Sequence, residues 1–209
     1  KKNLNNLNKL GVLNKIKILK CDTKNFKIVN KLIKKIKPKE IYYLCGQSSV
    51  IKSFLNPVEA FRSNTVGLLN ILLTVKKIKK NIKIFNAISG EIYGNTKNNI
   101  FNEKSNIDPH SPYGVSKASS FWLTKIFREC YGIKCCNGIL FNHESPLRSD
   151  EFVTKKIINH CQLIKKRKLK YLYLGNINIY RDWGWAPEYV KAMYLMLRQK
   201  HPKDLVIGS

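Results

Sequence analysis

Tyr113 and Lys117 have the residue types and the spacing that proton transfer at a hydroxyl group requires. They are four residues apart, so on a helix they lie on one face, one turn from each other. A phenol ionises at a pH of about 10 in water, and a nearby ammonium group stabilises the phenolate. We therefore expect Lys117 to lower the pKa of Tyr113, which then takes a proton from a hydroxyl while hydride leaves the carbon. Lys117 is also suited to holding a cofactor ribose.

Ser89 and Glu91 follow the apolar run 82–87 and extend this chemistry. The Ser89 hydroxyl, at the end of a strand, is able to hydrogen-bond the same reacting oxygen as Tyr113. The Glu91 carboxylate is able to move a further proton, a step that a simple dehydrogenase does not need. Tyr and Lys at this spacing occur by chance on many helices, and Glu91 alone would fit a solvated loop. The combination indicates an active site.

These residues lie within a pattern of short apolar runs that alternate with longer amphipathic ones. The pattern predicts βαβ units and an α/β fold with a parallel sheet. The expected strands cover residues 16–19, 40–44, 82–87, 135–141, 171–174 and 205–207. The expected helices cover residues 25–37, 57–79, 112–130, 152–167 and 186–199. Polar residues cluster where several of these strands end, which is the edge at which open parallel sheets bind ligands.

Four blocks of sequence resemble the GDP-mannose 4,6-dehydratases, which are extended short-chain dehydrogenases/reductases. They are residues 41–50, Ser-Pro-Tyr-Gly-Val-Ser-Lys at 111–117, the block 138–146 with Phe-Asn-His-Glu-Ser-Pro, and Arg-Asp-Trp-Gly at 181–184. The resemblance runs from about Asn14 to Ser209. It implies a Rossmann-like parallel sheet with flanking helices, truncated at both ends, plus part of a small substrate-binding region.

The same resemblance implies two parts of the chain and a role for individual residues. Residues 1–145 are expected to form an NADP-binding domain that lacks its first strand, Gly-rich turn and helix. Residues 146–209 are expected to form part of the GDP-sugar-binding region, interleaved with the last strands of the sheet. The implied catalytic residues are Ser89, Glu91, Tyr113 and Lys117. The implied NADP contacts are Asp22, Thr23, Leu44, Cys45, Gly46, Gln47, Ser48, Lys117, His143 and Arg148. The implied GDP-sugar contacts are Asn142, Val153, Lys156, Asn176 and Arg181.

The reaction implied by the resemblance is dehydration of GDP-mannose to GDP-4-keto-6-deoxy-mannose with transient hydride transfer to NADP. Tyr113 removes the C4 hydroxyl proton, Glu91 removes the C5 proton as water leaves C6, and the hydride returns to C6. Thr23 departs from the leucine usual in the family, and Gly90 from its Ser or Asp. Because Gly-rich backbone amides bind the cofactor pyrophosphate, we expect this piece alone to bind NADP poorly. The family forms homodimers or tetramers, so a homo-oligomer is expected.

Two other functions remain open at the level of sequence. A nucleotide-sugar epimerase or reductase would keep Tyr113 and Lys117 but generally lacks a carboxylate like Glu91. A non-catalytic basic protein on the same scaffold would use the formal net charge of +26. However, that excess is almost all lysine, spread along the chain with Asn and Ile as in AT-rich coding sequence, whereas nucleic acid recognition favours clustered Arg. We expect no nucleic acid partner.

The remaining composition predicts a cytoplasmic enzyme. No apolar run approaches the length of a membrane span, and the polar N-terminal residues 1–10 do not resemble a signal peptide. The spacing of the six cysteines fits neither a zinc site nor a redox pair. We expect buried, reduced thiols, with Cys135 and Cys136 on opposite faces of a strand, and no metal.

Overall fold

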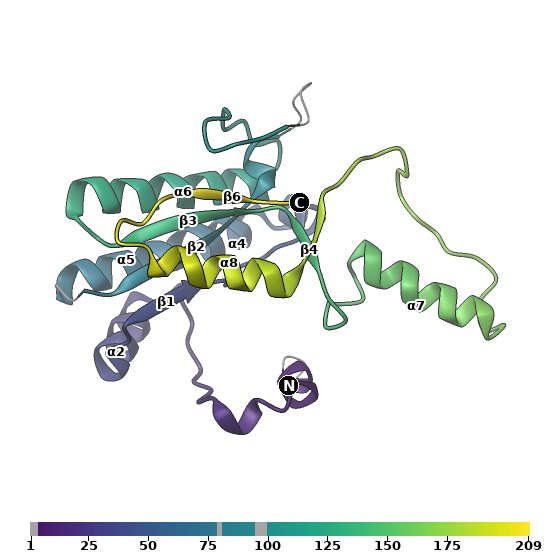
Figure 1. Ribbon diagram of the computed structural model, residues 1–209, viewed down its shortest axis with the longest axis horizontal. Helices are drawn as coiled ribbons and strands as arrows, with labels where there is room; N and C mark the ends of the chain where they lie inside the picture. Colours follow the sequence, from purple (N-terminus) through teal and green to yellow (C-terminus); the bar gives the residue numbers. More distant parts are fainter. Residues whose placement is uncertain (1–3, 79–80, 95–99) are drawn as a thin grey trace.

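The computed structural model describes residues 4–78, 81–94 and 100–209 and has an α/β fold (Figure 1). Its main sheet is parallel throughout, and its strands run in the order β1-β2-β3-β6. The strands are β1 (Glu40–Tyr43), β2 (Lys83–Ser89), β3 (Cys135–Leu140) and β6 (Leu205–Ile207). The prediction of a parallel sheet with flanking helices is confirmed. The carboxyl ends of these strands meet at one edge, where the candidate site lies.

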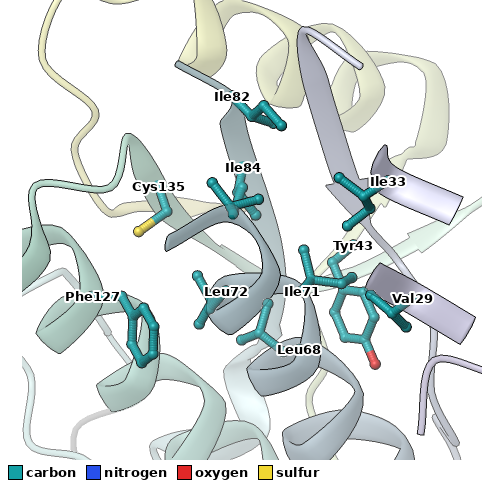
Figure 2. Close-up of a cluster of buried hydrophobic side chains, with 11 residues drawn as sticks. Val29, Ile33, Tyr43, Leu68, Ile71, Leu72, Ile82, Ile84, Phe127 and Cys135 are labelled. Carbon is teal, nitrogen blue, oxygen red and sulfur yellow. The ribbon is translucent and has the colours of Figure 1, made fainter. Parts of the chain in front are cut away.

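Helices cover both faces of the sheet. Side chains of α2 (Phe26–Ile36), α5 (Gly67–Ile78) and α6 (Pro112–Tyr131) pack on one face, and α8 (Ala186–Arg198) packs on the other. Figure 2 shows the largest cluster on the first face, where helix side chains meet Tyr43, Ile84 and Cys135 of three strands. Cys136 lies in the cluster beneath α8. The expectation that Cys135 and Cys136 point to opposite faces is therefore confirmed.

Helix α6 begins and ends at residues suited to those positions. The Ser111 side chain accepts a hydrogen bond from the backbone N–H of Gly114, and Pro112 occupies the first turn. Gly132 ends the helix with a φ of 63°, in the left-handed region. The predicted helix over 112–130 is confirmed, and its first turn carries Tyr113 into the protein.

The predicted helix 57–79 is interrupted by a π-helical turn. It forms α4 (Pro57–Phe61), the π turn η2 (Arg62–Val66) and α5. The polar side chains of Ser63, Asn64 and Thr65 are buried in this turn and bond to groups outside it. A short helix before it, α3 (Val50–Leu55), was not predicted, because six residues are too few to show the helical period.

Two predicted strands are wrong. Residues 16–19 and 171–174 are not strands, and exposed side chains such as Ile18 and Tyr173 lie along them. A strand exists only with a hydrogen-bonded neighbour, and neither segment has one in the described parts of the chain. Conversely, β4 (Asn142–Glu144) and β5 (Trp183–Trp185) pair in a small parallel sheet that was not predicted, because three residues carry no visible period.

The remaining helices lie outside the main layers. They are α1 (Leu4–Lys9), the 3-10 turns η1 (Leu13–Lys15) and η3 (Gly90–Ile92), and α7 (Val153–Lys165). Helix α7 has no buried residue and projects away from the sheet (Figure 1). No helix in the described ranges is long and apolar enough to cross a membrane.

The cysteines are free, but the expectation of buried thiols holds only for some of them. Cys135 and Cys136 are buried, whereas Cys45, Cys130 and Cys161 are exposed. The exposed three lie outside the sheet, on a strand-end loop and two helices, where no layer covers them. Among the described residues, no cluster of His, Cys, Asp or Glu could hold a metal ion.

Candidate active site

Tyr113 and Lys117 lie on the inner face of α6, as their spacing predicts. Their exposed fractions are 7% and 6%. The Lys117 Nζ is 5.9 Å from the centroid of the Tyr113 ring and donates a hydrogen bond to the backbone oxygen of Ala87 at 2.8 Å. Because Ala87 belongs to β2, this bond ties the ammonium group to the strand that carries Ser89.

The charge balance at Tyr113 differs from the expectation. Burial raises its pKa to about 12; hydrogen bonding to Ser89 lowers it, the charge of Glu91 raises it, and the charge of Arg148 lowers it. Burial also lowers the pKa of Lys117 to about 8. The expected lowering of the Tyr113 pKa by Lys117 is therefore wrong: desolvation outweighs the nearby charges, and Lys117 directs one of its N–H groups to the Ala87 backbone oxygen.

Ser89 and Glu91 reach Tyr113 through a tight turn at the end of β2. The Ser89 Oγ accepts a hydrogen bond of 3.3 Å from the backbone N–H of Glu91, which starts η3. This turn packs on the start of α6, where a Cβ added to Gly114 would lie only 2.7 Å from the Glu91 backbone oxygen. Glycine at 114 thus allows the close approach that brings the predicted catalytic residues together.

Packing against an aromatic ring also explains why residue 90 is glycine. A Cβ at this position would lie 2.8 Å from Cε1 of Phe141, whose ring covers the turn. The departure noted in the sequence is therefore accompanied by an aromatic ring that occupies the space of the missing side chain.

A cavity of about 860 Å³ opens beside Ser89 and Glu91. Of the residues predicted to contact the sugar nucleotide, Asn142 and Arg181 line it. Val153, Lys156 and Asn176 do not: the first two lie on α7, and the Asn176 side chain accepts a hydrogen bond from the nearby N–H of Asn178. Further lining residues that sequence reasoning missed include Asn102, Glu103, Phe141, Asn178, Tyr180 and Asp182. Only Phe141 and Asp182 fell within blocks that the sequence singled out.

The segment after β1, predicted to lie under the cofactor, is fixed by the buried π turn. Gly46 has a φ of 127°, and a Cβ there would lie 2.0 Å from the Asn64 Oδ1. The Asn64 Nδ2 donates to the Gln47 backbone oxygen at 3.0 Å, and the Gln47 N–H donates to the Ser63 Oγ at 3.1 Å. The segment runs beside α6, because Asn64 also bonds the Ser116 Oγ at 3.1 Å.

The other residues before α3 that are predicted to contact NADP are mostly exposed. Leu44 and Cys45 are exposed, and Ser48 follows Gln47 in the same loop. Asp22 and Thr23 lie just before α2. The Asp22 Oδ1 accepts a hydrogen bond from the backbone N–H of Lys24. The Thr23 backbone oxygen accepts one from the Asn70 Nδ2 at 2.9 Å. Thr23 packs toward Gly67, since a Cβ there would lie 2.8 Å from its Oγ1.

His143 and Arg148 are held by neighbours on and after β4. The His143 Nδ1 is 2.9 Å from the Phe141 backbone oxygen, and its ring stacks on Tyr189 with centroids 4.7 Å apart. The Arg148 guanidinium lies 3.5 Å from the centroid of the Phe152 ring. Its Nε is 3.3 Å from a Glu144 carboxylate oxygen, an ion pair without an aligned hydrogen bond.

The parallel sheet and the buried Tyr113 and Lys117 at its edge define an extended short-chain dehydrogenase/reductase. RMD from Pseudomonas aeruginosa, solved with NADPH, has this fold with a TM-score of 0.84 at 22% identity; the match covers 91% of this chain and 66% of that one. The UDP-N-acetylglucosamine 4-epimerase from Methanobrevibacter ruminantium M1 has a TM-score of 0.75 at 25% identity, over 86% and 57% of the two chains.

Sequence comparison narrows this class to one family. The family described as GDP-mannose 4,6 dehydratase matches residues 1–209. The GDP-mannose 4,6 dehydratase of Drosophila melanogaster is 40% identical over 86% of this chain and 46% of its own length. GDP-mannose 4,6 dehydratase 1 of Arabidopsis thaliana is 43% identical over 83% of this chain and 49% of its own length. The chain belongs to the GDP-mannose 4,6-dehydratase family, and it spans about half the length of these relatives.

Proposed function

We propose that this chain forms the catalytic core of a hydro-lyase that converts GDP-mannose to GDP-4-keto-6-deoxy-mannose. One observation carries the proposal: Ser89 and Glu91 lie together at the wall of a large cavity, next to the buried phenol of Tyr113. A dehydration needs a proton acceptor besides the phenol, and the Glu91 carboxylate at the cavity wall is the acceptor that we propose. The named activity of the relatives supports GDP-mannose as the substrate.

NADP is the cofactor that we propose for the edge of the sheet. Gly46 lets the loop backbone approach Asn64, whose Oδ1 lies 2.0 Å from where a Cβ would be and is buried without a hydrogen-bond partner in the described part of the chain. The exposed Leu44 offers an apolar surface beside it. Bound NADP would supply the reversible acceptance of a hydride. The residues proposed to hold it are Asp22, Thr23, Leu44, Cys45, Gly46, Gln47, Ser48, Lys117, His143 and Arg148.

Tyr113 is the proposed base for the C4 hydroxyl of the sugar. Its phenol oxygen takes the hydroxyl proton, and the Ser89 hydroxyl hydrogen-bonds the same sugar oxygen. The phenolate is disfavoured by burial, so the groups that stabilise it decide the rate. The Ser89 hydrogen bond and the Arg148 charge lower the pKa of Tyr113. The Lys117 ammonium, 5.9 Å from the centroid of the Tyr113 ring, is a further cation that could stabilise the phenolate.

Glu91 is the proposed base for the second proton. Oxidation at C4 makes the adjoining C5 hydrogen acidic, and the Glu91 carboxylate would take this proton and pass it to the C6 hydroxyl, which leaves as water. Asn142 and Arg181, on the cavity wall, are proposed to hold the GDP-sugar in this orientation. The other residues proposed to contact the GDP-sugar lie on α7 or after it, outside the cavity wall: Val153, Lys156 and Asn176. They would contact the GDP-sugar only if it extends from the cavity toward α7.

An epimerase or reductase is the second candidate, favoured by the fold that the chain shares with epimerases such as the Methanobrevibacter enzyme. Incubation of the full-length protein with GDP-mannose and NADP⁺ separates the two. We expect a 4-keto-6-deoxy sugar nucleotide and no net consumption of NADP⁺. Formation of an epimer, or stoichiometric change of the cofactor, would instead favour the second candidate. Salt-resistant binding of nucleic acid without turnover would favour the basic binding protein.

A homo-oligomer is proposed on the basis of one exposed apolar face. Helices α3, α4 and α6 lie side by side and leave large apolar side chains in solvent. We define this as the α3/α4/α6 face, with Ile51, Leu55, Val58, Val115, Trp122 and Ile126. Exposed apolar side chains gathered on neighbouring helices are typical of subunit interfaces, and a second copy would offer the same side chains in a symmetric dimer.

The proposed division of the chain places the NADP-binding domain at residues 1–145 and part of the sugar-nucleotide region at residues 146–209. Within residues 146–209, α7 projects outward, whereas α8 and β6 pack on or pair with the main sheet. This arrangement supports the proposal that the sugar-nucleotide region is interleaved with the last strands of the sheet.

A further inference from the structure

Tyr189 is a buried aromatic residue that neither the predicted chemistry nor the cavity uses. It lies in the first turn of α8 and is 3% exposed. Its ring stacks on the imidazole of His143, with centroids 4.7 Å apart and planes inclined by 27°. The stack joins α8, on one face of the sheet, to the strand end where the proposed cofactor residues lie.

The neighbouring strand is shaped to admit this ring. His143 pairs with Gly184 in the small sheet of β4 and β5. A Cβ on Gly184 would lie 2.2 Å from the Tyr189 Cε2 and 2.8 Å from its hydroxyl oxygen. Any larger residue at 184 would therefore push the Tyr189 ring off the imidazole.

The hydrogen bond of His143 determines which nitrogen is left for a ligand. The Nδ1 is 2.9 Å from the Phe141 backbone oxygen. A carbonyl oxygen only accepts, so the Nδ1 must carry the proton, and in a neutral imidazole the Nε2 then holds a lone pair. Within the part of the chain that the structure describes, the Nε2 makes no hydrogen bond.

We propose that Tyr189 is a positioning residue for His143: its ring and the Phe141 oxygen hold the imidazole with Nδ1 protonated and Nε2 free to accept a hydrogen bond from the cofactor. This inference rests on the proposed role of His143 in binding NADP. A partner for Nε2 must be a donor, such as an amide N–H or a ribose hydroxyl. The Tyr189 hydroxyl has no hydrogen-bond partner in the described residues, so the ring, not the hydroxyl, does the positioning.

The first test reads the imidazole directly. In ¹⁵N-histidine-labelled protein, His143→Gln identifies the signals of residue 143 among the four histidines. We expect a protonated Nδ1 and an unprotonated Nε2 at neutral pH in the wild type and in Tyr189→Phe, and a mixture of tautomers in Tyr189→Leu and Gly184→Ala. Phe127→Leu is the control, because it also shortens a buried helix aromatic but lies in the cluster on the other face.

The second test measures the dissociation constant of NADP with the full-length protein. We expect Tyr189→Leu and Gly184→Ala to weaken binding on the order of tenfold, as loss of support behind a ligand residue typically does. Tyr189→Phe and Phe127→Leu should stay within about twofold of the wild type, since neither removes the ring behind His143.

The outcomes separate this inference from the proposed function. An unchanged tautomer in Tyr189→Leu and Gly184→Ala would overturn the positioning role. A changed tautomer with wild-type NADP affinity would overturn its link to the cofactor. If wild-type full-length protein does not bind NADP at all, the proposed function fails, while the tautomers still decide whether Tyr189 positions His143.

Discussion

The Lys117 Nζ lies on the same side of α6 as the Tyr113 ring, 5.9 Å from its centroid, but it donates its hydrogen bond to the Ala87 oxygen. Both groups are buried, and burial moves their pKa values apart: to about 12 for the phenol and about 8 for the ammonium. At neutral pH the phenol is therefore neutral, whereas the ammonium, with a pKa of about 8, stays mostly protonated. Proton abstraction by Tyr113 needs the phenolate, which burial disfavours.

The buried ammonium makes the stability of the fold depend on pH. The pKa of Lys117 is about 8 in the fold against 10.5 ordinarily, so the unfolded chain binds more protons between these values. Stability should rise with pH through this window, and the full penalty, on the order of 3 kcal/mol, is present below pH 8. Urea unfolding of wild type and Lys117→Met from pH 7 to pH 10 measures it.

The difference between the two proteins cancels the raised pKa of the Cys135 thiol, which Lys117 does not influence. The Cys45 thiol, whose pKa the charge of Lys117 lowers, is replaced by serine in both proteins. We expect the advantage of Lys117→Met to shrink as pH rises. A difference that does not change with pH would show that Lys117 is not desolvated.

Arg148 should control the pH dependence of the reaction. Its charge lowers the pKa of Tyr113, so Arg148→Gln should raise that pKa and move the acidic limb of the kcat profile to higher pH. For every tenfold loss in the acidity of the phenol, the rate at a given pH on that limb falls about tenfold. The profile is measured at saturating NADP, so that lost cofactor affinity does not enter. An unmoved limb with a lower plateau would assign Arg148 to binding alone.

Gly46 should tolerate alanine much less well than Gly132. Both have positive φ, but a Cβ at Gly132 meets nothing within 4 Å, whereas one at Gly46 would lie 2.0 Å from the Asn64 Oδ1. Gly132→Ala should cost about 1 kcal/mol of unfolding free energy through backbone strain alone. Gly46→Ala should cost at least about twice as much. Equal losses in chemical denaturation would mean that the loop after β1 is free to move away from Asn64.

The α3/α4/α6 face should hold two copies of the protein together. Leu55 is 82% exposed on this face, and Leu55→Asp places a charge where a partner would pack. Sedimentation velocity of the full-length protein should show a lower oligomeric state for this variant. Ile177→Asp is the matched control, since Ile177 is 74% exposed but lies on the segment after α7. Equal oligomeric states for the wild type and Leu55→Asp would place the interface elsewhere.

The sequence predicted those features whose causes are local. Helix α6 was predictable because Ser111, Pro112 and Gly132 mark its ends, and β2 because most residues of the run 82–87 are apolar. Strands at 16–19 and 171–174 were wrong because pairing is decided by distant residues. The same limit applies to the site: spacing placed Tyr113 and Lys117 on one face, but only tertiary burial shows which way their pKa values move.

The cavity was the least predictable part. Part of its wall comes from residues 178–182, which have no secondary structure and no periodic pattern. Tyr189 was equally hidden, because an aromatic residue in an amphipathic helix is ordinarily a core residue, and only its stack on His143 distinguishes it.

Glu91→Gln tests the central claim most directly. In the full-length protein with GDP-mannose labelled with tritium at C4, we expect transfer of label to the cofactor at a rate near that of wild type, because Tyr113, Ser89 and Lys117 are intact. We expect the 4-keto-6-deoxy product to form at least about 10²-fold more slowly, because the acceptor of the C5 proton is gone. Formation of that product at the wild-type rate would contradict the assignment of Glu91 and with it the dehydratase mechanism.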